Sequence, residues 1–417
     1  MKRLIKWGVL FMLIACLAFS SVGFAEQTND SSSASDYKTT EEYLLVKRFC
    51  ANYPNRSNQG NEIAVARGLV KEFEKIDGLE VSLQTGVNVV VEQTTYQSAN
   101  VVAKLDTPSS KSVVIGAHFD NNGVGEGAAD NAVGVVTMYL LAKKLAAVKS
   151  SLPCDVYFVA FGGEEQGLYG SKYFVDHMQT NGDLGNVLVM FNFDSLGVGD
   201  NLYVQCENKS TDLEKYLLSI AKDTPCALQV KPYAAGISAI ADSFGYGYYE
   251  STQGSDHTPF RLKGIPTAFF FSGNFTRLDG YTESTNAEHR ISNTSQDTFE
   301  NLDKYAGERF VNNMQTVQTV VFDALTTDLF MGVATDAKSQ LINISAAYGI
   351  VPSLVLVGLA LAAVIVVLGL RVKYSKGVQR STPFTSANAT DSGVFVKPDV
   401  SDVFDLGDDD DVFDDDK

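Results

Sequence analysis

Short apolar runs and longer segments of mixed polarity alternate through the middle of the chain. Continuous apolar runs between turn residues are typical of buried strands, and apolar residues every three or four positions are typical of helices. The predicted helices are 42–51, 62–76, 132–147, 170–179, 210–223 and 301–326, and the predicted strands are 79–91, 100–105, 112–117, 155–161, 187–193, 201–205 and 267–271. This alternation predicts an α/β fold with a mixed, largely parallel central sheet and helices on both faces.

The first 25 residues have the pattern of a secretory signal peptide. Residues 1–6 are basic, residues 7–19 are apolar, and small residues lead up to Ala25. This is the order that a signal peptidase reads, so we expect cleavage after Ala25. Lipidation at Cys16 is an alternative, because the residues before it resemble a lipoprotein cleavage box.

A second apolar run, residues 348–370, is long enough to cross a membrane. It contains no charged residue, and a helix of about 20 apolar residues spans a bilayer. Arg371 and Lys373 follow the run directly, and positive charges mark the cytoplasmic side. Together with a cleaved signal peptide, this predicts a single-pass protein of the cell membrane, with an extracytoplasmic domain and a cytoplasmic C-terminus.

These two features divide the rest of the chain into four predicted segments. They are a flexible leader at 26–36, the main domain at 37–329, a juxtamembrane segment at 330–347 and a disordered acidic tail at 371–417. The tail repeats one motif, Asp-Val-Phe-Asp, at 402–405 and 411–414. Acidic tails are usually solvated and disordered, but the repeat is also compatible with a docking motif for a cytoplasmic partner.

Charge and cysteine content narrow the possible functions. The net charge of −17 argues against a nucleic-acid partner, which would require a basic surface. After removal of the signal peptide four cysteines remain, Cys50, Cys154, Cys206 and Cys226. An even number outside the cell permits disulfides, and free buried thiols are an equal alternative. Their spacing does not indicate a cysteine zinc site.

Polar residues stand where three predicted strands end, and one further carboxylate precedes a predicted helix. They are His118 with Asp120, Glu164 with Glu165, Asp194, and Asp130 before the helix at 132–147. The carboxyl ends of parallel strands meet at one edge of a sheet, and an imidazole among carboxylates is a donor set that zinc binds. Each residue also has an ordinary interpretation, such as a helix N-cap for Asp130, but their joint placement favours a metal site.

The motifs around these residues resemble the co-catalytic di-zinc aminopeptidase family, which is related to glutaminyl cyclases and transferrin-receptor-like proteins. They are Gly116-Ala117-His118-Phe119-Asp120, Gly127-Ala128-Ala129-Asp130-Asn131, Gly162-Gly163-Glu164-Glu165-Gln166-Gly167, Asn192-Phe193-Asp194-Ser195 and Gly254-Ser255-Asp256-His257-Thr258-Pro259-Phe260. The resemblance covers roughly residues 100–301, in order, and its motifs are specific as a set.

The resemblance implies a site for two zinc ions. His118 and Asp194 would bind the first zinc, and Asp130 would bridge both ions. Glu165 would bind the second. Water would attack a peptide carbonyl polarised by zinc.

The resemblance also implies roles for residues that do not bind metal. Glu164 would be the general base that accepts the proton of the water and passes it to the leaving amine. Asp120 would orient the His118 ring through its other nitrogen. Asp256 and His257 would help to form the wall of the substrate pocket.

We further consider Tyr249, or its neighbour Tyr248, as a contact to the tetrahedral oxyanion.

The last metal ligand departs from the family pattern. The family has a His four residues before an Asp-Thr pair, whereas here Asn293 precedes Asp297-Thr298 by that distance. Three interpretations follow: His289 enters the site through a rearranged loop, Asn293 supplies its amide oxygen as a weaker ligand, or the second metal is lost.

These observations lead to three functional hypotheses. The first is a membrane-anchored, extracytoplasmic zinc aminopeptidase that acts on peptides. The second is a catalytically impaired peptidase-fold binding or receptor protein, because of Asn293. The third is a one-zinc acyltransferase resembling glutaminyl cyclase, which would have a Trp near the last ligand. The single Trp of the chain is Trp7, within the signal peptide.

Overall fold

The computed structural model describes residues 37–57, 61–206, 212–230, 254–273 and 291–339. The chain divides into two units, Met1–Gly349 and Ile350–Lys417, and every described residue belongs to the first. The predicted signal peptide, leader, membrane helix and acidic tail lie outside the described residues, as does the end of the juxtamembrane segment.

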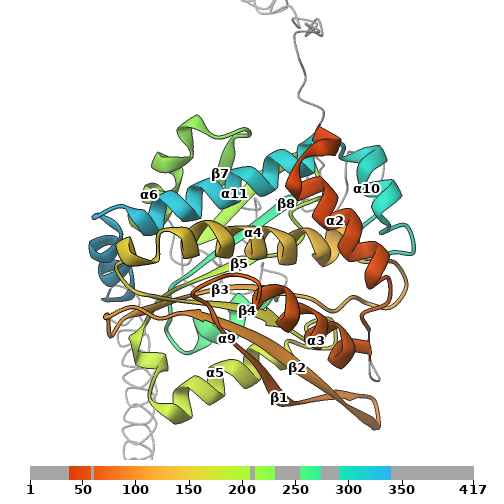
Figure 1. Ribbon diagram of the computed structural model, residues 1–417, viewed down its shortest axis with the longest axis horizontal. Coiled ribbons are helices and arrows are strands. Elements are labelled where there is room, and N and C mark those ends of the chain that lie inside the picture. The colour runs from red at the N-terminus through yellow and green to blue at the C-terminus, as the bar shows by residue number, and fades with distance from the viewer. Residues whose placement is uncertain (1–36, 58–60, 207–211, 231–253, 274–290, 340–417) are drawn as a thin grey trace, which may run out of the picture. The chain divides into compact units, whose positions relative to one another are not determined.

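An eight-stranded mixed sheet forms the centre of the domain (Figure 1). Its strands are β1 (Glu80–Val91), β2 (Thr94–Leu105), β3 (Ser112–His118), β4 (Asp155–Phe161), β5 (Val187–Phe193), β6 (Asn201–Cys206), β7 (Leu228–Val230) and β8 (Thr267–Gly273). Their order is β1-β2-β4-β3-β5-β8-β6-β7. The central strands β4, β3, β5 and β8 run parallel, and β2 and β6 flank them antiparallel. The predicted mixed α/β class is confirmed.

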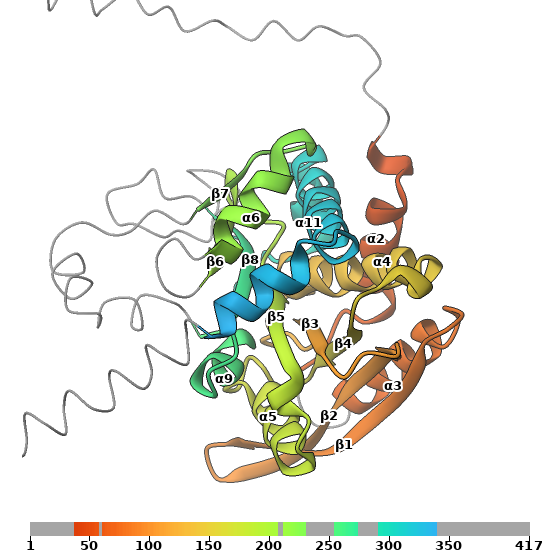
Figure 2. The same ribbon diagram turned by 90° about the vertical axis from the view of Figure 1, so that its left-hand side faces the viewer.

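Helices cover both faces of this sheet. They are α2 (Glu41–Asn52), α3 (Asn61–Phe73), α4 (Val133–Ala147), α5 (Tyr169–Asn181), α6 (Asp212–Ile220), α9 (His257–Leu262), α10 (Phe299–Tyr305) and α11 (Glu308–Thr326), with short turns at Tyr37–Thr39, Lys149–Ser151, Leu184–Asn186 and Ala221–Asp223. Helices α2, α3, α4, α6 and α11 pack on one face, and α5 and α9 pack on the other. Figure 2 shows the β1–β2 hairpin at one edge of the sheet, and α6 beside β6 and β7 at the other.

The central strands are largely apolar because they are buried on both sides. All seven residues of β3 and of β5 are buried. Val113 and Ile115 face the core below α4, whereas Val114 faces the smaller core below α5. Two-sided burial of parallel strands explains why these segments read as continuous apolar runs rather than as alternating ones.

The predicted helix at 301–326 is wrong in its extent, because two helices occupy this region. Helix α10 begins at Phe299, where the Thr298 hydroxyl accepts a hydrogen bond from the Asn301 backbone N–H. It ends before Gly307, whose φ of 54° is incompatible with a continuous helix. The apolar periodicity continues across this break, so the pattern did not reveal it. The short elements β7 and α9 were not predicted either.

The packed domain also continues past residue 329, where the sequence predicts a juxtamembrane segment. A helix at Phe330–Ser339 buries Phe330 and Ala334 completely. The Phe330 ring lies 6.3 Å from that of Phe191, measured between centroids. Only about every fourth residue of this helix is buried, and the helix is short. Its amphipathic pattern therefore did not distinguish it from a linker in the sequence.

Within the described residues, no single helix is both long and apolar enough to cross a bilayer. Helix α11 and the helix at Phe330–Ser339 meet the length and composition criteria together, but their axes differ by 93°. The predicted membrane helix at 348–370 lies outside the described part of the chain. Cys50, Cys154, Cys206 and Cys226 are free thiols, so the free-thiol alternative applies.

The start of α5 provides a test of this packing. A methyl group at Gly170 would lie 2.4 Å from Asn100 Oδ1 and 2.5 Å from the Gly162 carbonyl oxygen. We expect Gly170→Ala to lower the free energy of unfolding by about 1–3 kcal/mol, as overpacking does, measured by urea denaturation. Gly185→Ala is the matched control, because no atom lies within 4 Å of its new methyl group. Equal stabilities of the two variants would contradict the described packing.

Candidate metal centre

Three neighbouring parallel strands bring polar residues to one edge of the sheet. His118 is the last residue of β3, the Glu164-Glu165 pair follows β4, and Asp194 follows β5. Asp130 comes from an irregular turn, Ala128–Ala132, that leads into α4. The predicted convergence of these segments is therefore observed.

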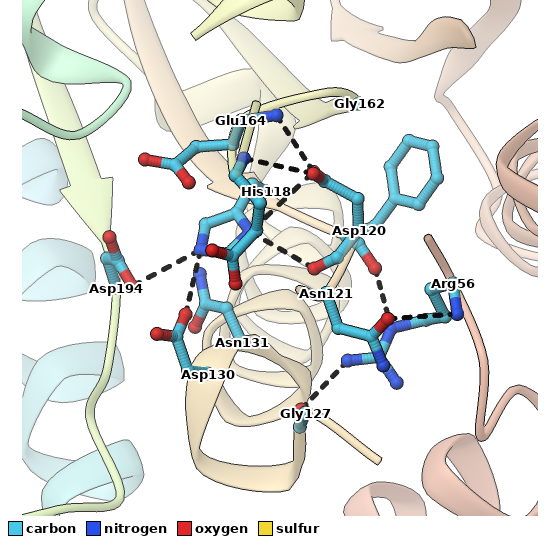
Figure 3. Close-up of polar contacts among 12 residues, drawn as sticks. Arg56, His118, Asp120, Asn121, Gly127, Asp130, Asn131, Gly162, Glu164 and Asp194 are labelled. Atoms are coloured by element: carbon cyan, nitrogen blue, oxygen red, sulfur yellow. Dashed lines mark hydrogen bonds and ion pairs between the residues drawn. The ribbon is translucent and has the colours of Figure 1, made fainter. Parts of the chain in front are cut away.

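His118 lies at the centre of this group, between two carboxylates (Figure 3). Its Nε2 atom is 3.1 Å from Asp130 Oδ1 and 3.3 Å from Asp194 Oδ1. The side chain is 1% exposed. One donor atom from each of the three residues lies within 4.8 Å of the others, a spacing at which one metal ion can bind all three.

A hydrogen bond on the far side of the imidazole sets its tautomer. His118 Nδ1 lies 3.2 Å from the Asp120 carbonyl oxygen, which can only accept, so Nδ1 carries the hydrogen. In the neutral ring Nε2 then directs a lone pair at two carboxylates, an arrangement that requires a positive charge between them. Burial alone would lower the pKa of His118, but the charges of Glu164 and Asp194 raise it well above 6.5. A proton or a metal cation meets this requirement.

Asp120 also fixes the turn that carries the glutamate pair. Its Oδ1 accepts a hydrogen bond from the Glu164 backbone N–H and its Oδ2 accepts one from that of Glu165, both at 3.1 Å. Its carboxylate is farther from the ring, with Oδ1 3.7 Å from His118 Nδ1. The carbonyl of Asp120 therefore makes the closer contact to the ring, and its carboxylate positions Glu164 and Glu165.

The two glutamates lie in a region of strongly negative potential. Burial raises the pKa of Glu164 well above its usual range, and the nearby carboxylates of Asp256 and Asp194 raise it further. Burial and the charge of Asp130 raise the pKa of Glu165 to about 9. Glu165 Oε1 is buried and has no hydrogen-bond partner among the residues that the structure describes. Buried polar atoms are nearly always paired, so this oxygen is suited to a cation.

Asp194 is stabilised in its charged form. Burial would raise the pKa of Asp194, but the charge of His118 and several hydrogen bonds lower it overall. Ser255 Oγ donates to Asp194 Oδ2 at 2.7 Å, and Ser195 Oγ donates to Oδ1 at 3.1 Å. Asn192 Nδ2 in turn donates to Ser255 Oγ. A carboxylate held ionised in this way is a good metal ligand.

Asn293 lies directly beside Asp130. Its Nδ2 donates to Asp130 Oδ2 at 2.9 Å, and Ser292 Oγ donates to the same oxygen at 3.2 Å. Asn122 Nδ2 donates to Asn293 Oδ1 at 3.1 Å. The other candidate for the last ligand, His289, lies outside the described residues, as do Tyr249 and Tyr248.

The two residues predicted for the pocket wall lie at the start of α9. Asp256 is fully buried, and burial raises its pKa to about 7. Its charge also acts on Glu164, so it lies near the general-base candidate. His257 stacks on Phe269 with 4.5 Å between ring centroids.

A fully buried arginine that the sequence analysis missed supports the site from behind. Arg56 is 0% exposed, and among the described residues its guanidinium donates only to carbonyl oxygens. Arg56 Nε donates to the Phe119 oxygen at 2.6 Å, and Arg56 Nη2 donates to the Gly127 oxygen at 2.8 Å (Figure 3). The arginine thereby joins the segments that carry Asp120 and Asp130. Nothing in the sequence near Arg56 indicated this role.

Asp297 is a second support whose role the sequence analysis did not assign. Its Oδ1 accepts a hydrogen bond from the Ala129 backbone N–H at 2.7 Å, and its Oδ2 accepts one from the Asp130 N–H at 3.1 Å. Burial raises the pKa of Asp297 to about 7, and the Asp130 charge contributes. The Asp297-Thr298 pair of the family motif was the sequence signal that could have identified this support.

The peptide bond between Asp130 and Asn131 is cis.

Comparisons with known proteins agree with this arrangement. A model of peptidase family M28 matches residues 100–318. Aminopeptidase YwaD of Bacillus subtilis is 28% identical over 282 residues, which cover 65% of this chain and 54% of YwaD. The probable lipoprotein aminopeptidase LpqL of Mycobacterium tuberculosis is 27% identical over 209 residues, which cover 49% of this chain and 41% of LpqL. The chain thus spans about half the length of these curated relatives.

A solved structure shows the same fold. The LapA aminopeptidase of Legionella pneumophila superposes with a TM-score of 0.51 at 20% identity, and the match covers 69% of this chain and 71% of LapA.

The raised pKa of Asp297 predicts a pH dependence of stability in the metal-free protein. The folded state retains a proton up to about pH 7, whereas an unfolded Asp loses it near pH 4. The free energy of unfolding should therefore fall as pH rises from about 4 to about 7, with Asp256 contributing in the same direction.

Asp297→Asn should reduce this slope by up to about 1.4 kcal/mol per pH unit, the contribution of one proton. Urea denaturation at several pH values measures it, with the exposed Asp183→Asn as control. The same slope in wild type and Asp297→Asn would contradict the assignment.

Proposed function

The chain belongs to peptidase family M28, and we propose that it is a zinc-dependent aminopeptidase that hydrolyses the N-terminal peptide bond of extracytoplasmic peptides. The observation that carries the proposal is the convergence of His118, Asp130 and Asp194 beside a glutamate with a strongly raised pKa, Glu164. The names of the relatives YwaD and LpqL, both described as aminopeptidases, support it.

The donor set fits zinc. His118 would offer Nε2 once its proton is displaced, and Asp130 and Asp194 offer oxygens, which is a common mixture for catalytic zinc. Asp130 and Glu165, whose buried Oε1 has no partner among the described residues, would hold a second metal ion. When bound, zinc polarises a carbonyl and lowers the pKa of water.

In this proposal Glu164 carries the proton. Its carboxylate accepts a proton from the attacking water and then donates it to the nitrogen of the leaving amine, which breaks the peptide bond without a net change in protonation. A raised pKa suits this task, because the group must hold the proton between the two steps. The Asp120 carboxylate keeps Glu164 in place by accepting its backbone N–H.

Other residues of the chain would orient the metal ligands or line the substrate pocket. The Asp120 carbonyl holds the His118 ring so that Nε2 faces the metal position. Ser255 and Ser195 hold Asp194 ionised. Asp256 and His257 are proposed to line the substrate pocket, together with Tyr249 from outside the described residues.

A second candidate function is a peptidase-fold binding protein without activity. The observation in its favour is Asn293 in the place where the family has a metal-binding His, in contact with Asp130. The aminopeptidase is preferred because Glu164, its support Asp120 and the three converging ligands are all present.

We also propose that the chain is anchored in the cell membrane by residues 348–370, with the peptidase domain outside and the acidic tail in the cytoplasm. The uncharged apolar run and the positive residues after it support this topology.

Substitution of the general base tests the proposed chemistry. Glu164→Gln should lower the rate of aminoacyl-amide hydrolysis by about 10²–10⁴-fold, the usual contribution of a general base. Zinc per chain should stay unchanged. The exposed Glu74→Gln is the control and should keep full activity. A Glu164→Gln variant with an undiminished rate, or a wild type with neither zinc nor activity, would rule out the proposal.

Membrane extraction tests the proposed topology. The full chain should stay with the membranes after an alkaline carbonate wash, and protease added to intact cells should digest the domain but spare the tail. A variant with Leu359→Arg and Val366→Arg should be released, because an Arg at the helix centre costs about 2.5–3.5 kcal/mol of insertion and the second Arg adds to this cost. Release of the wild type by carbonate would contradict the anchor.

A further inference from the structure

The two sides of Asp130 meet different sets of donor atoms. Its Oδ1 faces His118 Nε2 at 3.1 Å, within the group completed by Asp194. This side therefore combines one imidazole nitrogen with carboxylate oxygens. Catalytic zinc sites commonly combine donors in this way.

On the other side of Asp130, the hydrogen bonds to its Oδ2 come from an amide and a hydroxyl group of the described residues. Asp130 Oδ2 accepts hydrogen bonds from Asn293 Nδ2 at 2.9 Å and from Ser292 Oγ at 3.2 Å. Glu165 is held at the same edge of the sheet by the hydrogen bond from its backbone N–H to Asp120 Oδ2, and its buried Oε1 has no partner among the described residues. The donors available to a cation here are the oxygens of Asp130, Glu165, Asn293 and Ser292.

Asn293 can present either end of its amide to this position. The terminal torsion of an Asn side chain is broad and roughly two-fold, so a half-turn exchanges Nδ2 for Oδ1. Without a cation, Asn293 Nδ2 points toward Asp130 and donates a hydrogen bond to its Oδ2. With a cation, the oxygen is the favourable end. Asn122, which holds Asn293 Oδ1, is partly exposed and can turn with it.

The chemistry of these donors selects a different class of metal. Imidazole suits zinc, whereas carboxylate and amide oxygens suit Mg²⁺, Ca²⁺ and Mn²⁺. We propose that the second position, formed by Asp130, Glu165 and Asn293, binds a hard divalent cation such as Mn²⁺, Mg²⁺ or Ca²⁺ instead of a second zinc. The protein then carries two unlike metals. The inference rests on the proposed function for the zinc at His118, but not on the activity.

Metal counting on the full-length protein tests this inference. After removal of metals with a chelator, reloading with zinc and desalting, the wild type should hold one zinc per chain by elemental analysis. The zinc-loaded protein should then bind one Mn²⁺ per chain, seen as loss of the electron paramagnetic resonance signal of free Mn²⁺. Ca²⁺ or Mg²⁺ should compete with it.

A single substitution should convert the second position to zinc. Asn293→His should raise the count to two zincs per chain and weaken Mn²⁺ binding at least about tenfold, which is about 1.4 kcal/mol. Asn293 has φ = 58°, and His is among the residues that tolerate this region. Asn88→His, on the exposed side of β1, is the matched control and should leave both counts unchanged.

Glu165→Gln is a second variant, which tests the inference even if the Asn293→His protein does not fold. It should lose the Mn²⁺ site and keep the zinc, and the thermal unfolding midpoint of the metal-free variant should be no lower than that of the wild type.

Two zincs per wild-type chain after desalting would overturn the inference. A fall from two zincs to one in His289→Ala would overturn it as well, because an imidazole would then complete the second position. These counts do not depend on catalysis. A failure of the proposed function would instead appear as hydrolysis that is absent or insensitive to Glu164→Gln, whatever the metal content.

Discussion

The site depends on an excess of negative charge around one buried imidazole. His118 Nε2 lies within 3.3 Å of two carboxylate oxygens, and Glu164 and Glu165 add two further acids to the same small region. Removing so many charges from water is costly unless a cation compensates them. The raised pKa values of His118, Glu164 and Glu165 result from the same excess of negative charge, because in the metal-free protein bound protons reduce it.

The rest of the structure prevents this repulsion from dispersing the ligands. Three parallel strands fix the starting points of His118, Glu164 and Asp194, and backbone hydrogen bonds fix the loops. Asp297 holds the turn of Asp130 by two N–H groups. Arg56 joins the segments that carry Asp120 and Asp130 and brings a buried positive charge behind them. Neutral hydroxyl and amide donors hold Asp130 and Asp194, so the charges of these two ligands remain available to a metal.

Much of this site could be predicted from the sequence, because it follows from strand ends. His118, Glu164 and Asp194 each come directly after an apolar run, and parallel strands place such residues together. Arg56 could not be found in this way, since it binds carbonyls 63 and 71 residues away through a loop without a motif.

Elements without a distinct pattern were also missed. Helix α9 is only six residues long, and the break at Gly307 interrupts no periodicity. The departure at Asn293 was visible in the sequence, but its contact with Asp130 required the structure.

The most direct test of the account is the exchange of protons for metal at His118. Zinc should be titrated into the metal-free full-length protein at neutral pH, with a pH-indicator dye in weak buffer. The account predicts saturable binding with release of at least one proton per zinc, because ligands held protonated must give up their protons. Both the binding and the release should be lost in His118→Ala. Zinc binding without proton release, or equal binding by His118→Ala, would contradict the account.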